Sequence, residues 1–188
     1  SKGADKKGRK SSTKPKKSEK SKYSKQKKNY ESLEERSFNN QLSSLGLHIS
    51  YMEADGNCMF RSIADQVCDN PEDHLTFRHK IVSYIEENKE HFELFLDDTE
   101  TFDDYIERMK NPHEWGDHME LFAASQCLNI NFCVHQINAP NYILPAIDNK
   151  TLNKTIHISY HGDCHYNSVR ALNTHQHNSS VISFSPKK

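Results

Sequence analysis

The chain has 188 residues, which is near the size of one domain, and a net charge of −1. Its five cysteines are odd in number and contain no C-x-x-C spacing, so they indicate neither a disulfide framework nor a zinc site nor a redox pair, and we expect no metal and no cofactor. No apolar run is long enough to cross a membrane and no secretory signal peptide is present, so we expect an intracellular protein, cytoplasmic or nuclear, whose thiols stay reduced.

The charge is unevenly distributed along the chain. Residues 1–28 hold thirteen Lys or Arg and two acidic residues, whereas the remainder holds 12 basic and 24 acidic residues. Tyr23 is the only aromatic residue in 1–28, so this segment cannot bury a core and we expect it to be disordered on its own. This segment has three interpretations. It is a solvated tail, or it binds an anionic or import partner (nucleic acid, a nuclear-import factor or an anionic membrane), or it folds back on the acidic domain. Ser1, where an initiating Met would stand, suggests a fragment or a processed chain.

Helices are predicted mainly in the first two thirds of the chain. Residues 29–45 form a helix that ends at Gly46, and 47–51 form a short strand. Further helices begin at Cys58 and at Asn70-Pro71, a third has an apolar face over 102–109, and a fourth covers 117–128.

Strands are predicted over 130–137, 142–147, 155–160 and 165–171, with turns at 138–140 and 148–150. The strand over 155–160 alternates apolar and polar residues, which predicts a half-buried strand. Residues 181–184 could add an edge strand. Helices followed by hairpin-connected strands indicate an α+β fold with a small, mainly antiparallel sheet.

Cys58 is placed where a helix begins. The apolar residues Phe60, Ile63, Ala64 and Val67 follow the rhythm of a buried helix face, so Cys58 lies in the first turn, where free N–H groups and the helix dipole favour a thiolate. Such a thiol, near an imidazolium, can have its pKa lowered. Gly56 permits a turn that aims backbone N–H groups beside the sulfur, as in an oxyanion hole. Taken alone, this segment favours a buried structural cysteine in an ordinary capped helix.

His165 supplies the matching imidazole. Residues i and i+2 of a strand face the same side, so His165 and Asn167 point together, and Asn167 could hold the ring in the tautomer that leaves one nitrogen for the thiol. A thiol, an imidazole and an orienting amide are the parts of a cysteine hydrolase.

Three separated segments resemble the ovarian-tumour (OTU) family of cysteine deubiquitinases. They are D-G-N-C-M-F-R at 55–61, W-G-D-H-M-E-L at 115–121 and H-Y-N-S-V-R at 165–170. V-H-Q-I-N-A-P at 134–140 is similar to the OTU-domain-containing subgroup. The resemblance covers 45–172 and implies a papain-like α+β fold that hydrolyses bonds at the C-terminus of ubiquitin. We therefore expect a basic tail over 1–28, a protease domain over 29–172 and a tail or edge strand over 173–188.

The resemblance also implies roles for individual residues. Cys58 is the nucleophile, His165 the general base and acid, Asn167 the third member of the triad, and Asp55 the acid that shapes the oxyanion loop. Gly56 and Asn57 contribute to that loop. Several relatives carry Asp where this chain has Asn167, and a neutral amide stabilises a cationic imidazole less than a carboxylate does.

The expected function is hydrolysis of ubiquitin isopeptide bonds by a monomeric thiol protease acting on ubiquitin or polyubiquitin chains. One alternative is a catalytically silent ubiquitin-binding module with a nucleic-acid-associated tail, and another is the same chemistry on a different ubiquitin-like modifier.

Other side chains keep two interpretations each. Trp115 is a core anchor for the helix that follows it, or else a substrate contact. Glu120 caps or pairs near the catalytic helix, or lies on a solvated face. Cys164 is ranked below Cys58 because no helix begins there. His157 and His161 suggest a metal site, but we see no cysteine or carboxylate at ligand spacing apart from Cys164. The acidic runs at 86–93 and 97–104 are solvated faces, or contacts to the basic face of ubiquitin.

Overall fold

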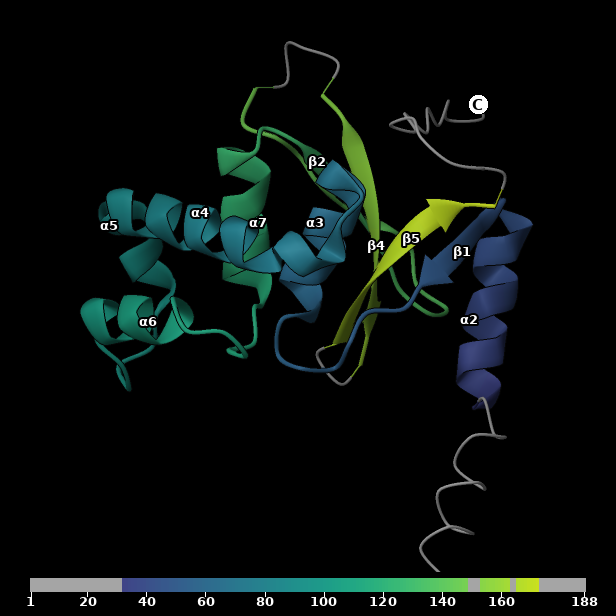
Figure 1. Ribbon diagram of the computed structural model, residues 1–188, viewed down its shortest axis with the longest axis horizontal. Coiled ribbons are helices and arrows are strands. Elements are labelled where there is room, and N and C mark those ends of the chain that lie inside the picture. Colours follow the sequence, from purple (N-terminus) through teal and green to yellow (C-terminus); the bar gives the residue numbers. More distant parts are fainter. Residues whose placement is uncertain (1–31, 149–152, 163–164, 173–188) are drawn as a thin grey trace, which may run out of the picture. The chain divides into compact units, whose positions relative to one another are not determined.

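A computed structural model describes residues 32–148, 153–162 and 165–172 (Figure 1). Its contacts divide the chain into two compact units, Ser1–Arg36 and Ser37–Lys188. In the first unit the described residues open helix α2, where the Ser32 hydroxyl accepts a hydrogen bond from Glu35 N and the Glu35 carboxylate accepts one from Ser32 N. The expected tail over 1–28, the region 173–188 with its edge strand, and Cys164 lie outside the described residues.

The second unit is built from helices and one sheet (Figure 1). The α-helices of the described chain are α2 (Leu33–Ser44), α3 (Cys58–Cys68), α4 (His74–Glu87), α5 (Lys89–Phe92), α6 (Phe102–Met109) and α7 (His118–Cys127), and the 3-10 helices are η1 (Pro71–Asp73) and η2 (Glu93–Phe95). The strands are β1 (Leu47–Ser50), β2 (Asn131–His135), β3 (Tyr142–Leu144), β4 (Thr155–His161) and β5 (His165–Ala171). The predicted α+β class is confirmed, and the predicted elements lie within a few residues of the observed ones. None of the helices in the described segments has the length and apolar character that crossing a membrane requires.

The five strands form one sheet in the order β1-β5-β4-β2-β3. Three neighbouring pairs are antiparallel, as expected, and β2 and β4 are parallel, with Cys133 opposite His157 and His135 opposite Ser159. The sheet is therefore mixed but mainly antiparallel.

The two faces of the sheet differ in chemistry. Phe132, Ile156, Ile158 and Tyr166 lie on one face and belong to the main apolar core, together with buried residues of α3, α4, α6 and α7. On the other face, Phe38 and Leu42 of α2 pack with Leu47, Ile49 and Val169 of the β1–β5 edge. Between these apolar residues and β3, that second face carries a polar row over β2, β4 and β5, namely Cys133, His135, His157, Ser159, His161, His165 and Asn167.

Two expectations about burial are wrong. The β4 segment is not half buried, because it is the middle strand of the sheet and both faces are covered: Ile156, His157, Ile158 and Ser159 are all buried. Val67 does not continue the buried face of α3, since it is 38% exposed near the end of that helix.

Replacing Leu42 by Ala tests whether α2 covers the second face of the sheet. Leu42 is fully buried, so Leu42→Ala should lower the free energy of unfolding by about 2–5 kcal/mol through lost burial and a residual cavity. Leu94→Ala, at an 83% exposed leucine, should stay within about 0.5 kcal/mol of the parent. Urea unfolding measures both, and equal effects would contradict this packing.

Candidate functional site

Cys58 lies at the N-terminus of α3, as predicted, with Asn57 at the position that precedes the helix. Cys58 is buried, with 3% of the residue exposed. Tyr166 N, on β5, donates a hydrogen bond to Cys58 Sγ over 3.5 Å. The start of α3 and the start of β5, more than a hundred residues apart, therefore meet at the sulfur.

The loop before Cys58 is organised by Asp55. Its Oδ1 accepts from Asn57 N (2.9 Å) and its Oδ2 from Asn57 Nδ2 (3.0 Å), and Arg61 adds hydrogen bonds from Nε and Nη2 at 3.2 and 2.9 Å. Burial alone would raise the pKa of Asp55, but the hydrogen bonds from Arg61 and Asn57 outweigh it and hold the pKa well below its usual range. Because Asn57 N already donates to Asp55, this N–H is not free to serve as an oxyanion donor in this arrangement, and the N–H of Cys58 is the candidate donor that remains.

Arg78, on α4, also holds the loop before Cys58 in place. This role was not predicted from the sequence. The Arg78 side chain is fully buried, and burial lowers its pKa to about 10, so it is still a cation at neutral pH. The guanidinium donates to four oxygen atoms, which are Met109 O (3.1 Å), Gly56 O (3.2 Å), Asn57 Oδ1 (2.9 Å) and Glu114 O (2.6 Å). The central guanidinium carbon, Cζ, also lies 4.1 Å from the centre of the Phe60 ring. One side chain thus connects the cysteine loop with the segment that joins α6 to α7.

Gly56 has the positive φ of 82° that the expected turn requires. A Cβ atom at this position would lie 1.9 Å from the carbonyl oxygen of His113, so both the backbone conformation and the space exclude a side chain. His113 N donates to Asn57 Oδ1 over 2.9 Å, which brings this neighbouring segment against the loop.

The environment of the Cys58 sulfur raises the pKa of its thiol. Desolvation by burial is the largest cause, and the backbone N–H groups of Tyr166, Met59 and Cys58 itself oppose it only in part. Among the residues that the structure describes, no hydrogen bond joins the sulfur to the His165 ring, so no imidazolium compensates for burial. The expected lowering of the thiol pKa is therefore wrong for this arrangement.

The structure brings His165 and Asn167 together on β5. His165 Nε2 lies 3.1 Å from Asn167 Oδ1, which also accepts a hydrogen bond from Met52 N at 2.8 Å. Since this oxygen is an acceptor, Nε2 must donate, and the neutral ring therefore carries its lone pair on Nδ1. His165 Nδ1 is buried and has no hydrogen-bond partner among the described residues.

His161 extends this chain of hydrogen bonds. Asn167 Nδ2 lies 3.1 Å from His161 Nε2, and Ser159 Oγ lies 3.1 Å from the same nitrogen. The His161 ring also packs edge-on against Phe38, with ring centres 5.3 Å apart. The Asn167 amide is thus held on both sides, which fixes the face that it offers to His165.

Trp115 and Glu120 each had two interpretations, and the structure places one side chain at the surface and the other in the interior. Trp115 is 48% exposed, so its interpretation as a core anchor is wrong; it lines a cavity of about 670 Å³ together with Phe95, Tyr142 and Leu144, among others. Neither Cys58 nor His165 lines that cavity. Glu120 is buried, and it caps α7 by accepting a hydrogen bond from Asp117 N over 2.6 Å and another from the Tyr105 hydroxyl, so the solvated face is wrong.

A second group of ligand-type side chains lies on the polar row, away from Cys58. Cys133, His135 and His157 place one sulfur and two nitrogen atoms within 4.8 Å of one another. Cys133 was not predicted as a partner of His157, which lies 24 residues further along the chain. The signal that could have found it was Cys133-Val134-His135, whose outer two residues share a strand face.

Comparisons with known proteins match most of this unit. A family model described as OTU-like cysteine protease matches residues 53–177. The chain is 43% identical over 134 residues to OVARIAN TUMOR DOMAIN-containing deubiquitinating enzyme 7 of Arabidopsis thaliana, covering 71% of this chain and 36% of the relative. It is 34% identical over 137 residues to OTU domain-containing protein 3 of Mus musculus, covering 73% and 34%. The chain thus spans about a third of the length of these curated relatives.

Solved structures share the fold. An OTUD1 OTU domain aligns with a TM-score of 0.67 at 22% identity, over 73% of this chain and 94% of that one. An ovarian tumor (OTU) domain in complex with ubiquitin aligns with a TM-score of 0.56 at 22% identity, over 65% and 69%.

Replacing Arg78 by Lys tests its hold on the cysteine loop. A lysine keeps the charge but cannot reach four separated acceptors, and each buried acceptor left without a donor costs about 1–3 kcal/mol, so we expect the free energy of unfolding to fall by about 2–5 kcal/mol. Arg108→Lys is the matched control, because Arg108 is a partly exposed arginine paired with Glu100, and it should cost about 1 kcal/mol or less. Urea unfolding measures both variants, and a tolerated Arg78→Lys would contradict the role of Arg78.

Proposed function

The chain belongs to the OTU-like cysteine protease family, and we propose that it is a deubiquitinase in which Cys58 attacks the bond at the C-terminus of ubiquitin. The observation that carries this proposal is the tautomer of His165. Asn167 binds its Nε2 and leaves Nδ1 without a described partner, on the strand whose next N–H, from Tyr166, contacts the sulfur of Cys58.

The proposed reaction begins with proton transfer. His165 Nδ1 takes the proton of the Cys58 thiol as the sulfur bonds to the carbonyl carbon of ubiquitin's terminal glycine. The N–H of Cys58, in the first turn of α3, stabilises the oxyanion that forms. When the intermediate collapses, the carbon–nitrogen bond breaks and His165 gives its proton to the departing lysine amine. A water molecule, deprotonated by His165, then hydrolyses the thioester and restores the thiol.

In this mechanism Asp55, Asn57 and Arg78 are positioning residues. They hold the loop through hydrogen bonds and do not reach the reacting atoms. Asn167 orients His165 and stabilises its cationic form less than a carboxylate would. Ubiquitin or polyubiquitin is the proposed partner. The proposal also includes that the protein is a monomer, that it acts inside the cell and that its basic tail contacts an anionic partner.

Turnover of a fluorogenic amide of the ubiquitin C-terminus tests the function and the nucleophile together. The parent should turn it over, Cys58→Ala should have no detectable turnover, and His165→Ala should lose about 10²–10⁴-fold in rate as a general acid and base is removed. Cys68→Ser, at an exposed thiol, should match the parent.

Each other outcome has a distinct meaning. Equal turnover by the parent and Cys58→Ala would show that another nucleophile acts. Folded parent protein that binds ubiquitin but neither turns over the amide nor forms an adduct with a ubiquitin electrophile would support a silent binding module. Turnover of another modifier in preference to ubiquitin would reassign the substrate.

The pH dependence of alkylation tests the state of the thiol in the free protein. Because burial raises the pKa of Cys58, the thiolate is the minor form at neutral pH, and the rate of Cys58 alkylation by iodoacetamide should still be rising at about pH 8.5, the pKa of a free thiol. Mass spectrometry of the Cys58 peptide measures this rate. A plateau below pH 8 would show instead that a thiolate–imidazolium pair exists before substrate binds.

A further inference from the structure

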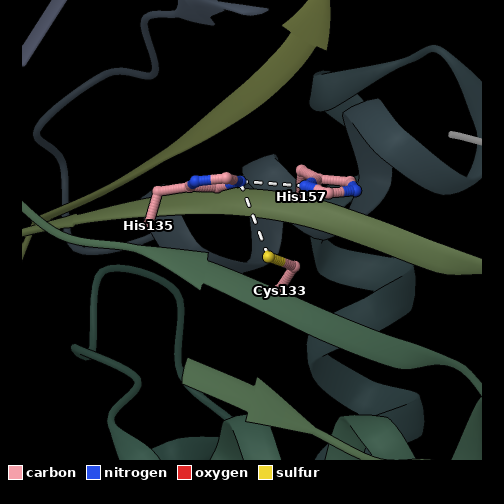
Figure 2. Close-up of side chains that lie close together, drawn as sticks. All are labelled: Cys133, His135 and His157. Carbon is pink, nitrogen blue, oxygen red and sulfur yellow. Dashed lines mark hydrogen bonds between the residues drawn. The ribbon is translucent and has the colours of Figure 1, made fainter. Parts of the chain in front are cut away.

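Three ligand-type side chains converge where β2 and β4 run parallel. Cys133 and His135 are two residues apart on β2 and so share a face, and His157 is the partner of Cys133 on β4. Figure 2 shows His135 at the centre of two contacts: its Nε2 lies 3.6 Å from Cys133 Sγ and 2.9 Å from His157 Nδ1. The three atoms all lie within 4.8 Å of one another.

The donor set identifies the class of ligand. One sulfur and two imidazole nitrogens suit zinc and exclude magnesium and calcium, which prefer oxygen. Zinc–nitrogen bonds of about 2.0–2.1 Å and a zinc–sulfur bond of about 2.3 Å, at tetrahedral angles, place two nitrogens about 3.3 Å apart and sulfur and nitrogen about 3.6 Å apart. The observed separation of Cys133 Sγ and His135 Nε2 already equals the sulfur–nitrogen value, and the two nitrogens need to move apart by about 0.4 Å. The third pair, Cys133 and His157, has its ligand atoms within 4.8 Å and must reach the same sulfur–nitrogen value in such a site.

Burial makes this arrangement distinctive. Cys133, His135 and His157 are 4%, 0% and 2% exposed. Polar atoms that are removed from water cost free energy unless they are paired, and an ion bound at this point would engage all three at once. In the described part of the chain, no further His, Cys, Asp or Glu joins the group, so a tetrahedral ion would have its fourth position open to water or a small exogenous ligand.

We propose that Cys133, His135 and His157 bind one zinc ion that ties β2 to β4. Binding forms one Zn–S and two Zn–N bonds and releases the thiol proton of Cys133 to solvent. The hydrogen between the two rings moves to the outer nitrogen of the same ring, so both imidazoles bind as neutral ligands and one proton leaves per ion. The ion would join the central strand β4 to the edge hairpin of β2 and β3.

Metal titration of the full chain tests this site. The titration uses Cys58→Ala, because Cys58 and His165 form another thiol and imidazole pair that could take zinc. After removal of metal by a chelator, cobalt(II) should bind at one equivalent per chain, with the visible absorption of a tetrahedral ion and a thiolate-to-cobalt charge-transfer band. Zinc should then bleach both signals and raise the melting temperature.

Two further variants show which cysteine provides the sulfur that binds the metal. Adding Cys133→Ser should abolish the charge-transfer band and weaken zinc binding at least tenfold. Adding Cys127→Ser is the matched control and should change neither, because burial raises the pKa of both thiols to about 11 but Cys127 lies on α7, where its sulfur contacts Ala124 O. Circular dichroism of the metal-free variants checks that each is folded.

X-ray absorption of the zinc-loaded Cys58→Ala chain gives the answer even where Cys133→Ser does not fold. One sulfur and two imidazole nitrogens in the first coordination shell are expected. No zinc uptake, binding that Cys133→Ser leaves intact, or a shell without sulfur would each overturn the proposal and leave the three residues as a buried hydrogen-bonded group.

Discussion

The buried guanidinium of Arg78 is the constraint on which the candidate site depends. A charge removed from water is costly unless it is paired, and Nη1 and Nη2 of Arg78 find oxygen acceptors only because two separate segments supply them, whereas its Nε has no hydrogen-bond partner among the described residues. The cysteine loop provides some of these acceptors and the α6–α7 connection the rest. Because Asn57 also accepts from His113 and donates to Asp55, a displacement of any one segment would leave buried polar atoms unpaired in the others.

The second organising feature is the polar row across the sheet. It begins at Cys133 on β2, crosses β4 at His157 and Ser159, and reaches Asn167 and His165 on β5. Buried sheet faces are commonly apolar, and along this row hydrogen bonds between side chains take the place of apolar contact, two of them between neighbouring strands and one within β4. One end of the row orients the proposed general base, and the other end holds the proposed zinc ligands.

Much of the site follows from local patterns in the sequence, and the remainder depends on contacts that no local pattern contains. The helix phase after Asn57 places Cys58 at a helix start, and the two-residue period of a strand places His165 beside Asn167, so both were predictable. The role of Arg78 was not predictable, because an arginine within a helix such as α4 is common and its hydrogen-bond partners lie 21 to 36 residues away in the sequence. The parallel pairing of β2 with β4, which brings Cys133 to His157, was also missed, since adjacent hairpins suggest antiparallel neighbours. The interpretation of Trp115 as a core anchor failed because the size of a side chain alone suggests burial, whereas most residues of the loop that carries it are exposed.

The pairing of β1 with β5 has a consequence for the newly made chain. Leu47 is opposite Ala171, so the strand that leads to the cysteine loop finds its partner only in the last strand of the sheet. A ribosome releases the chain from its N-terminus, and more than a hundred residues must follow Cys58 before His165 and Tyr166 emerge. Until then the Cys58 thiol has neither the proposed base His165 nor the Tyr166 N–H that contacts it, so a partly synthesised chain carries the cysteine segment without the rest of the proposed site. The order of the strands thereby makes completion of the domain a condition for the proposed chemistry.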